Sequence, residues 1–237
     1  MSLVSYERKD DVVVLTMDDS KMNSFSFEMI DQINKALDKA EKEQGSWSLL
    51  IVGNNKAFSA GFDLKTMTKP PCLEQHELFM QGGSLVMRLF EFPRPVIFGC
   101  SGHALALGAI MLMAGDFIVG KRGKGKIGIN EVAIGMTVPV FGVELARLRL
   151  SRKHFAKAVL QGSIYSPDEA VECGFLDIAV DENEFQSTCM AEATRLAKLK
   201  NPGFSNTKSF IKQETWRKIH ATIHEDGKRL LPREAKL

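Results

Sequence analysis

Hydrophobic positions along the chain form two patterns, which alternate and predict strands followed by helices. Short continuous runs of aliphatic and β-branched residues predict buried strands, and apolar residues that recur every three or four positions predict amphipathic helices. Glycine or proline follows several of these segments and ends them. The predicted strands are 12–15, 49–52, 96–98, 117–119 and 176–180. The predicted helices are 27–40, 78–92, 107–114, 166–174, 183–200 and 204–230.

The helix predicted near residue 166 has a strong sequence signal at its start. Ser166 can cap the helix, Pro167 suits the first helical position, and Glu169 stands three residues after the cap. Strands that alternate with helices along a chain indicate an α/β fold. We therefore expect one domain over residues 1–237, with an α/β core over about 1–182 and closing helices over about 183–237.

Composition and charge exclude several classes of function. Hydrophobic residues make up 44% of the 237 residues and charged residues 25%, which is ordinary for a soluble globular protein. The formal net charge of +2 is spread along the chain, so we expect no nucleic-acid surface, although a local site for a small anion remains possible. The longest apolar run, 104–114, is too short to span a bilayer, so no membrane association is expected.

The cysteines and the two ends of the chain give information about the cellular compartment of the protein. None of the four cysteines forms a CxxC pair, and the histidines do not join them at metal-ligand spacing, so reduced thiols and no metal site are expected. The N-terminus has no apolar core of a secretory signal. These features favour a cytoplasmic protein. The final Ala235-Lys236-Leu237 resembles an SKL-type address, so the peroxisome is the alternative in a eukaryote.

Two loops rich in small residues could bring backbone N–H groups to one point. Phe58–Leu64 follows a predicted strand and by itself reads as an ordinary connection. Gly102–Gly108 follows another strand and opens a helix, whose first N–H groups have no partner within the helix and lie at its positive end. Two such donors that face one point stabilise charge developing on a carbonyl oxygen.

In order and spacing, these segments resemble the paired motifs of the crotonase, or enoyl-CoA hydratase/isomerase, superfamily. The resemblance implies a spiral of strand–strand–helix units with a helical C-terminal part, assembled as a homotrimer or a dimer of trimers. It implies an acyl-CoA thioester as substrate, with coenzyme A as part of that substrate and no other cofactor. The matching segments are Phe58–Lys65, Gly102–Leu105, Asp116, Asn130–Glu131 and Ser166–Leu176, within about Val12 to Asp181.

The same resemblance assigns roles to residues of the two loops. The backbone N–H groups of Phe62 and Leu107 would form the oxyanion hole, and Ala60 would offer a backbone contact to the adenine of coenzyme A. Asp63 and Leu64 belong to the same motif and are expected to contact coenzyme A. Lys56 and Lys65 stand where the family often places positive charge near the phosphates, but solvated surface is an equally good interpretation of both.

The candidate base is Glu131, which stands in an apolar stretch between Lys126 and Gly135. A carboxylate can remove a proton next to a thioester carbonyl once the enolate oxygen is stabilised. Burial beside Val132 and Ile134 is expected to raise the pKa of Glu131, which suits a group that both takes and gives a proton. The competing interpretation is a structural glutamate in an ion pair.

The family's hydratases carry a second glutamate one helical turn into the second motif, and this chain has Ile110 there. Ile110 lies three residues after Leu107, so a helix would place both on one face. A single carboxylate beside an apolar wall matches the family's Δ3,Δ2-enoyl-CoA isomerases better than its hydratases. The alternatives are an enoyl-CoA hydratase of β-oxidation that uses Glu131 alone and, in another class, a non-catalytic acyl-CoA-binding protein.

Overall fold

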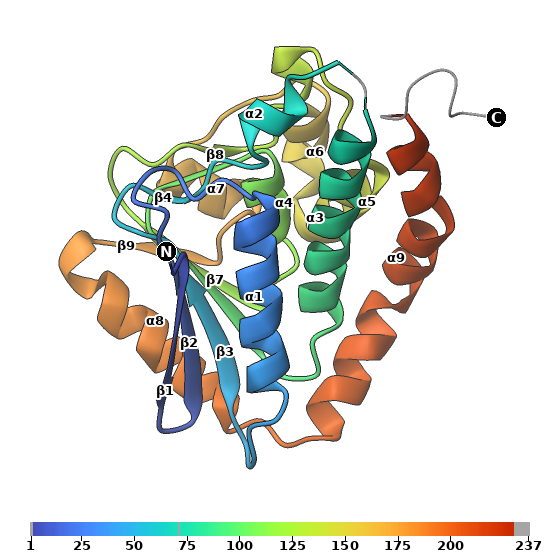
Figure 1. Cartoon of the computed structure of the whole chain (residues 1–237). Helices are drawn as coiled ribbons and strands as arrows, with labels where there is room; N and C mark the ends of the chain where they lie inside the picture. Colours follow the sequence, from blue (N-terminus) through green and yellow to red (C-terminus); the bar gives the residue numbers. More distant parts are fainter. Residues whose placement is uncertain (1, 71, 230–237) are drawn as a thin grey trace.

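A six-stranded sheet forms the centre of the computed structural model, which describes residues 2–70 and 72–229 (Figure 1). Its strand order is β1-β2-β3-β5-β7-β9, and β1 is antiparallel to β2 while the other neighbouring strands are parallel. A smaller parallel sheet has the order β4-β6-β8. The strands are β1 (Val4–Lys9), β2 (Val12–Met17), β3 (Ser48–Val52), β4 (Ala57–Ser59), β5 (Val96–Cys100), β6 (His103–Leu105), β7 (Phe117–Lys121), β8 (Ile127–Gly128) and β9 (Ile178–Val180).

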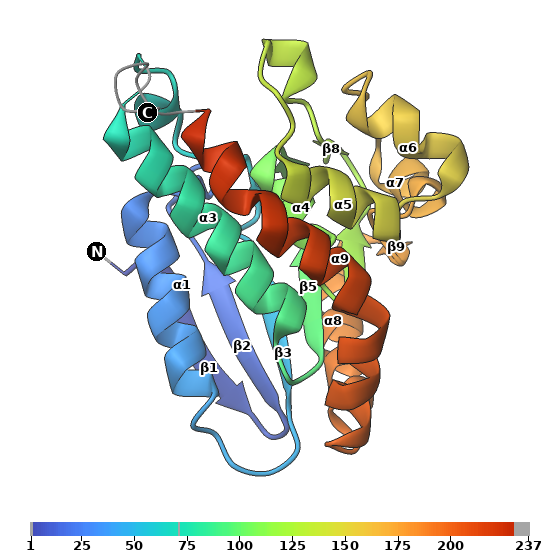
Figure 2. The same ribbon diagram turned by 90° about the vertical axis from the view of Figure 1, so that its right-hand side faces the viewer.

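Helices cover both faces of the large sheet. One face carries α8 and the other carries α1 and α3, with α9 outside α3 (Figures 1 and 2). The α-helices are α1 (Phe27–Ala40), α2 (Leu64–Met67), α3 (Leu73–Glu91), α4 (Leu107–Leu112), α5 (Val140–Arg149), α6 (Arg152–Val159), α7 (Pro167–Cys173), α8 (Glu182–Ala197) and α9 (Gly203–Lys228). A 3-10 turn, η1, spans Val132–Ile134.

A repeated connection confirms the predicted α/β spiral. Each of β3, β5 and β7 lies in the large sheet and is followed directly by a short strand of the small sheet, β4, β6 and β8 respectively. Helical segments then return the chain to the large sheet. The small strands are only two or three residues long, which is too short to produce a recognisable hydrophobic pattern.

Successive residues of the central strands pack on opposite faces of the large sheet, because side chains alternate along a strand. In β3, Leu49 and Ile51 belong to the main core with α1 and α3, whereas Leu50 packs with Phe185 and Cys189 of α8. Both faces are therefore apolar, which explains why the sequence shows continuous hydrophobic runs at these strands.

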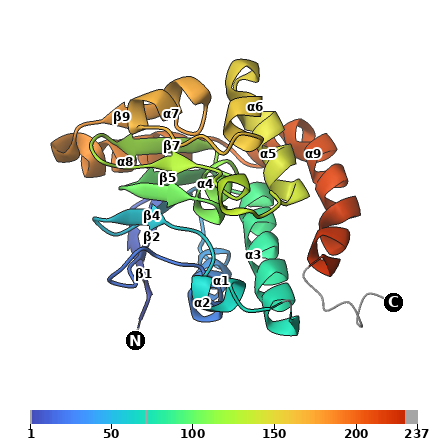
Figure 3. The same ribbon diagram turned by 90° about the horizontal axis from the view of Figure 1, so that it is seen from above.

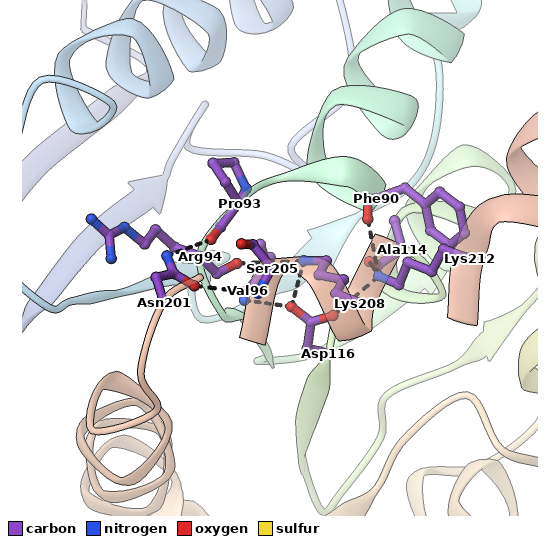
Figure 4. Close-up of polar contacts among 10 residues, drawn as sticks. All are labelled: Phe90, Pro93, Arg94, Val96, Ala114, Asp116, Asn201, Ser205, Lys208 and Lys212. Carbon is purple, nitrogen blue, oxygen red and sulfur yellow. Dashed lines mark hydrogen bonds and ion pairs between the residues drawn. The ribbon is translucent and has the colours of Figure 1, made fainter. Parts of the chain in front are cut away.

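Helix α9 is fixed to the sheet by a buried ion cluster around Asp116, just before β7 (Figure 4). The Asp116 carboxylate accepts hydrogen bonds from the Nζ atoms of Lys208 and Lys212, at 2.6 and 3.0 Å, and from the N–H of Val96 at 2.9 Å. Lys212 also donates to the Phe90 carbonyl at 3.0 Å. Burial lowers the pKa of Lys212 to about 8. This cluster holds the first half of α9 and so determines where its second half lies.

Several boundaries differ from the predictions. Helix α3 begins at Leu73, five residues before the predicted start, and runs through Gly82 and Gly83 without a break. Strand β1 and helices α2, α5 and α6 were not predicted. Among residues 2–70 and 72–229, no helix has both the length and the apolar character needed to cross a membrane. Leu230 and the Ala235-Lys236-Leu237 motif lie outside the described residues.

Candidate active site

The two small-residue loops meet because the strands before them are neighbours. Strands β4 and β6 pair in parallel, so their C-terminal ends lie at the same edge of the small sheet. A Cβ added at Gly61 would lie 3.4 Å from the backbone nitrogen of Leu107, and one added at Gly108 would lie 2.3 Å from the Ser59 carbonyl oxygen. Glycine at both positions therefore permits the close backbone approach that the sequence suggested.

Helix α4 begins directly at this junction. Its N-terminal flanking residue, Ala106, has φ 50° and ψ −125°, an unusual conformation for a residue with a side chain. Leu107 is the first residue of the helix, and its N–H cannot bond within the helix. The side chains of Phe62 and Leu107 both lie against Gly82 of α3, where an added Cβ would be 2.4 Å from Phe62 Cε1 and 3.1 Å from Leu107 Cδ2. Gly82 thus lets both residues reach the same place.

Phe62, Leu107, Ile110 and Glu131 line one cavity of about 240 Å³. Ile110 is fully buried and lies with Leu107 on the cavity side of α4, as the three-residue spacing predicted. Most of the lining is hydrocarbon or thioether, which suits an acyl chain. The apolar lining residues are Phe62, Met67, Phe79, Leu107, Ile110, Met136 and Pro139.

Glu131 has the environment of a proton-transfer group. Its side chain is 6% exposed, and within the described part of the chain its buried Oε2 has no hydrogen-bond partner. Desolvation is the main cause that raises the pKa of Glu131 to about 7, opposed by a hydrogen bond from its own backbone. The absence of a cationic partner for Oε2 argues against a structural ion pair.

The predicted cause of this burial was wrong. Val132 and Ile134 are 41% and 55% exposed, so they do not shield the carboxylate. They belong to the turn η1, which faces outward, while Glu131 immediately before it faces inward toward Leu107 and Ile110. Glu131 is buried as predicted, but residues distant in the sequence bury the carboxylate.

The residues expected to bind coenzyme A do not line this cavity. Lys56 lines a separate hollow with His103, and its Nζ donates to the Ser20 carbonyl at 3.0 Å. Asp63 caps α2 by accepting from the Thr66 N–H at 3.1 Å.

The remaining three lie in the loop before α2 or at the start of that helix. The backbone N–H of Ala60 donates to the Met22 carbonyl at 2.9 Å. Leu64 is 64% exposed, and Lys65 is exposed as well. All five residues lie between positions 56 and 65, close in sequence to Phe62, but only Phe62 of this segment lines the cavity.

Sequence reasoning missed the contribution of α9 to the cavity. Asp226 and Arg229 both line it, and Asp226 is only 4% exposed. The Asp226 carboxylate accepts a hydrogen bond from the N–H of Val140 at the start of α5, and burial raises the pKa of Asp226. Its sequence context, Glu225-Asp226-Gly227-Lys228, looks like solvated surface, so no local signal could have revealed its burial.

The spiral fold, together with a buried carboxylate beside the start of α4, defines a crotonase-type enzyme. The chain belongs to the enoyl-CoA hydratase/isomerase family, whose model matches residues 7–230.

Its relatives include proteins named as hydratases and proteins named as isomerases. The chain is 28% identical to a probable enoyl-CoA hydratase of Bacillus subtilis, over 83% of this chain and 77% of that protein. It is 27% identical to peroxisomal enoyl-CoA delta isomerase 2 of Arabidopsis thaliana, over 77% and 79% of the two chains. It also resembles the crystal structure of an enoyl-CoA hydratase/isomerase family protein from Pseudomonas syringae, with 36% identity, a TM-score of 0.92, and coverage of 97% and 98%.

Proposed function

We propose that the protein is a Δ3,Δ2-enoyl-CoA isomerase in which Glu131 carries the proton. The observation that carries this proposal is the pairing of Glu131 with Ile110 in one largely apolar cavity. Glu131 supplies a carboxylate next to the start of α4. Ile110 supplies hydrocarbon at the position where the resemblance puts a second glutamate in hydratases.

In this reaction the thioester oxygen accepts hydrogen bonds from the backbone N–H groups of Phe62 and Leu107. Glu131 removes a proton from C2, and the electron pair of that C–H bond forms the enolate. When the carbonyl reforms, the double bond moves to C2–C3 and C4 takes the proton back from Glu131. A pKa of about 7 suits both halves of this cycle at neutral pH.

Ile110 favours isomerisation over hydration because hydration needs a water molecule held and activated over C3. A hydrocarbon side chain cannot hold that water, whereas isomerisation takes no water into the product. Exclusion of water also strengthens backbone donors at the oxyanion. The Arabidopsis relative named as a delta isomerase supports this choice, and the Bacillus relative named as a hydratase keeps hydration as the alternative.

Coenzyme A would lie outside the cavity, with only the acyl group inside. Ala60, Asp63, Leu64 and Lys65 lie within three residues of Phe62 in the sequence, and Lys56 lies six residues before it, so all five remain proposed contacts. No resident cofactor takes part. We further propose a homotrimer or a dimer of trimers, located in the cytoplasm or, in a eukaryote, in peroxisomes.

Paired ultraviolet assays test the proposal. Conversion of 3-enoyl-CoA to 2-enoyl-CoA and hydration of 2-enoyl-CoA are measured at the same chain length, and kcat/KM for isomerisation is expected to be the larger. Faster hydration would establish the hydratase alternative. Tight binding of acyl-CoA with neither reaction would indicate a non-catalytic binding protein.

A further inference from the structure

A second hollow, of about 330 Å³, lies where three loops meet between the two sheets. The loops connect β3 to β4, β5 to β6 and β7 to β8, so each leaves the carboxyl end of a strand in the large sheet. A Cβ added at Gly102 would lie 2.1 Å from the Lys56 carbonyl oxygen, and one added at Gly125 would lie 3.0 Å from the Gly102 carbonyl oxygen. The three loops are therefore in contact, at a place where ligands commonly bind in parallel sheets.

This hollow is separate from the acyl cavity. Lys56, Gly102 and Gly125 lie shortly before β4, β6 and β8, whereas Phe62 and Leu107 follow the other ends of β4 and β6. No residue of the described part of the chain lines both spaces. In Figure 3, β4 and β7 lie on the side of the molecule away from α9, which contributes to the wall of the acyl cavity.

Two cations of the hollow have no carboxylate partner among residues 2–70 and 72–229. Lys121 and Arg122 line the hollow as well, but both are paired with carboxylates. Lys124 has no ion pair, and the Nζ atom of Lys56 donates only to the Ser20 carbonyl oxygen, at 3.0 Å. These two uncompensated charges favour an anion in the hollow.

Uncharged donors add to these charges. The Nδ1 atom of His103 accepts a hydrogen bond from the Lys126 N–H at 3.2 Å, so the ring proton lies on Nε2, which can donate it. Within the part of the chain that the structure describes, the backbone N–H groups of Gly102, Gly123 and Gly125 have no acceptor. Gly123 has φ 127°, and a Cβ added there would meet nothing within 4 Å, so a ligand can approach this backbone. Unpaired N–H groups in such turns are typical of anion sites.

We propose that this hollow binds a small phosphate-bearing anion, in addition to the acyl-CoA that the cavity takes. Ammonium groups, an imidazole N–H and backbone N–H groups are the donors with which proteins hold phosphate oxygens. A multiply charged anion would compensate both Lys56 and Lys124. Lys56 is also a proposed contact of coenzyme A, so the test must separate a free anion from the phosphates of the substrate.

Calorimetric titration with inorganic pyrophosphate tests the site, at low ionic strength because salt screens the attraction between charges. Lys124→Gln removes one of the two uncompensated charges. Lys126→Gln is the matched control, since Lys126 is an exposed lysine of the same loop that does not line the hollow. Lys124 is exposed too, so neither substitution should unfold the protein.

The wild type is expected to bind pyrophosphate, and Lys124→Gln should weaken the affinity by about 10- to 100-fold, the usual effect of losing a hydrogen bond to a charged group. Lys126→Gln should keep nearly the wild-type affinity, and saturation of the wild type with hexanoyl-CoA should leave it unchanged. No binding to the wild type, or equal weakening by both substitutions, would overturn the inference. Displacement of pyrophosphate by hexanoyl-CoA would overturn it as well, because the hollow would then hold the phosphates of coenzyme A.

Pyrophosphate binding is measured without turnover, so it does not depend on the proposed isomerase reaction. If hexanoyl-CoA does not bind at all, the proposed function fails. The comparison of Lys124→Gln with Lys126→Gln then still decides whether the hollow is an anion site.

Discussion

Replacement of Glu131 by glutamine tests the proposed reaction and its electrostatic basis together. The amide keeps the shape of the side chain but cannot carry a proton. Loss of a general base typically costs about 100- to 10,000-fold in rate, so isomerase kcat should fall by that factor while acyl-CoA affinity stays nearly unchanged. Glu172→Gln, an exposed carboxylate on α7, is the control and should keep wild-type activity.

The same substitution has a predictable effect on stability. Burial raises the pKa of Glu131 from 4.5 to about 7, which corresponds to about 3 kcal/mol of cost for holding the ionised form in the fold. Because the folded-state pKa is the higher one, this cost is absent below pH 4.5, grows between 4.5 and about 7, and is complete above that. As the pH rises from 4.5 to about 7, the free energy of unfolding of Glu131→Gln should therefore increase relative to that of the wild type by up to about 3 kcal/mol.

Urea unfolding of both proteins at pH 4, 6 and 8 measures this gain. The cost of burying the amide does not change with pH, so it cancels when the difference in unfolding free energy is compared between pH values. A rate within a few-fold of wild type would show that Glu131 is not the base. A pH-independent difference in unfolding free energy would show that the carboxylate is not held at a raised pKa. Either result would refute the corresponding part of the reasoning.

Three further predictions concern the same cavity. Isomerase kcat/KM should fall tenfold per pH unit below about 7, because only ionised Glu131 takes a proton; a flat profile down to pH 5 would point to another base. Ile110→Glu should raise the ratio of hydration to isomerisation, with Ile110→Leu as control, and an unchanged ratio would contradict the role given to Ile110. Gly82→Ala should lower kcat/KM and should lower the unfolding free energy by about 1–3 kcal/mol, because the added Cβ would meet the Phe62 ring. Gly203→Ala is the control and should cost little, because its Cβ would meet nothing within 4 Å. Equal melting temperatures for the two variants would exclude that clash.

Several features that depend on residues close together in the sequence were predicted correctly. The β-branched runs identified strands β2, β3, β5 and β7, and the Ser166 capping box located α7. Leu107 and Ile110 share a face of α4 because helix geometry fixes residues three apart. Glu131 stood out as a lone acid among apolar residues. Helices α5 and α6 were missed because the basic residues between them obscure any long apolar stripe.

The sequence by itself thus determined the α/β architecture, the two small-residue loops and the identity of the candidate base. Only the tertiary structure decided what surrounds that base, since Val132 and Ile134 turn outward and more distant segments enclose the carboxylate. Only the tertiary structure, likewise, turned Asp226 from an apparent surface charge into part of the cavity wall. The physical reason is that burial depends on how α9 crosses α3 and α5 (Figure 2). The ion cluster that holds α9 in place joins Asp116 to Lys208 and Lys212, which lie 92 and 96 positions later in the chain.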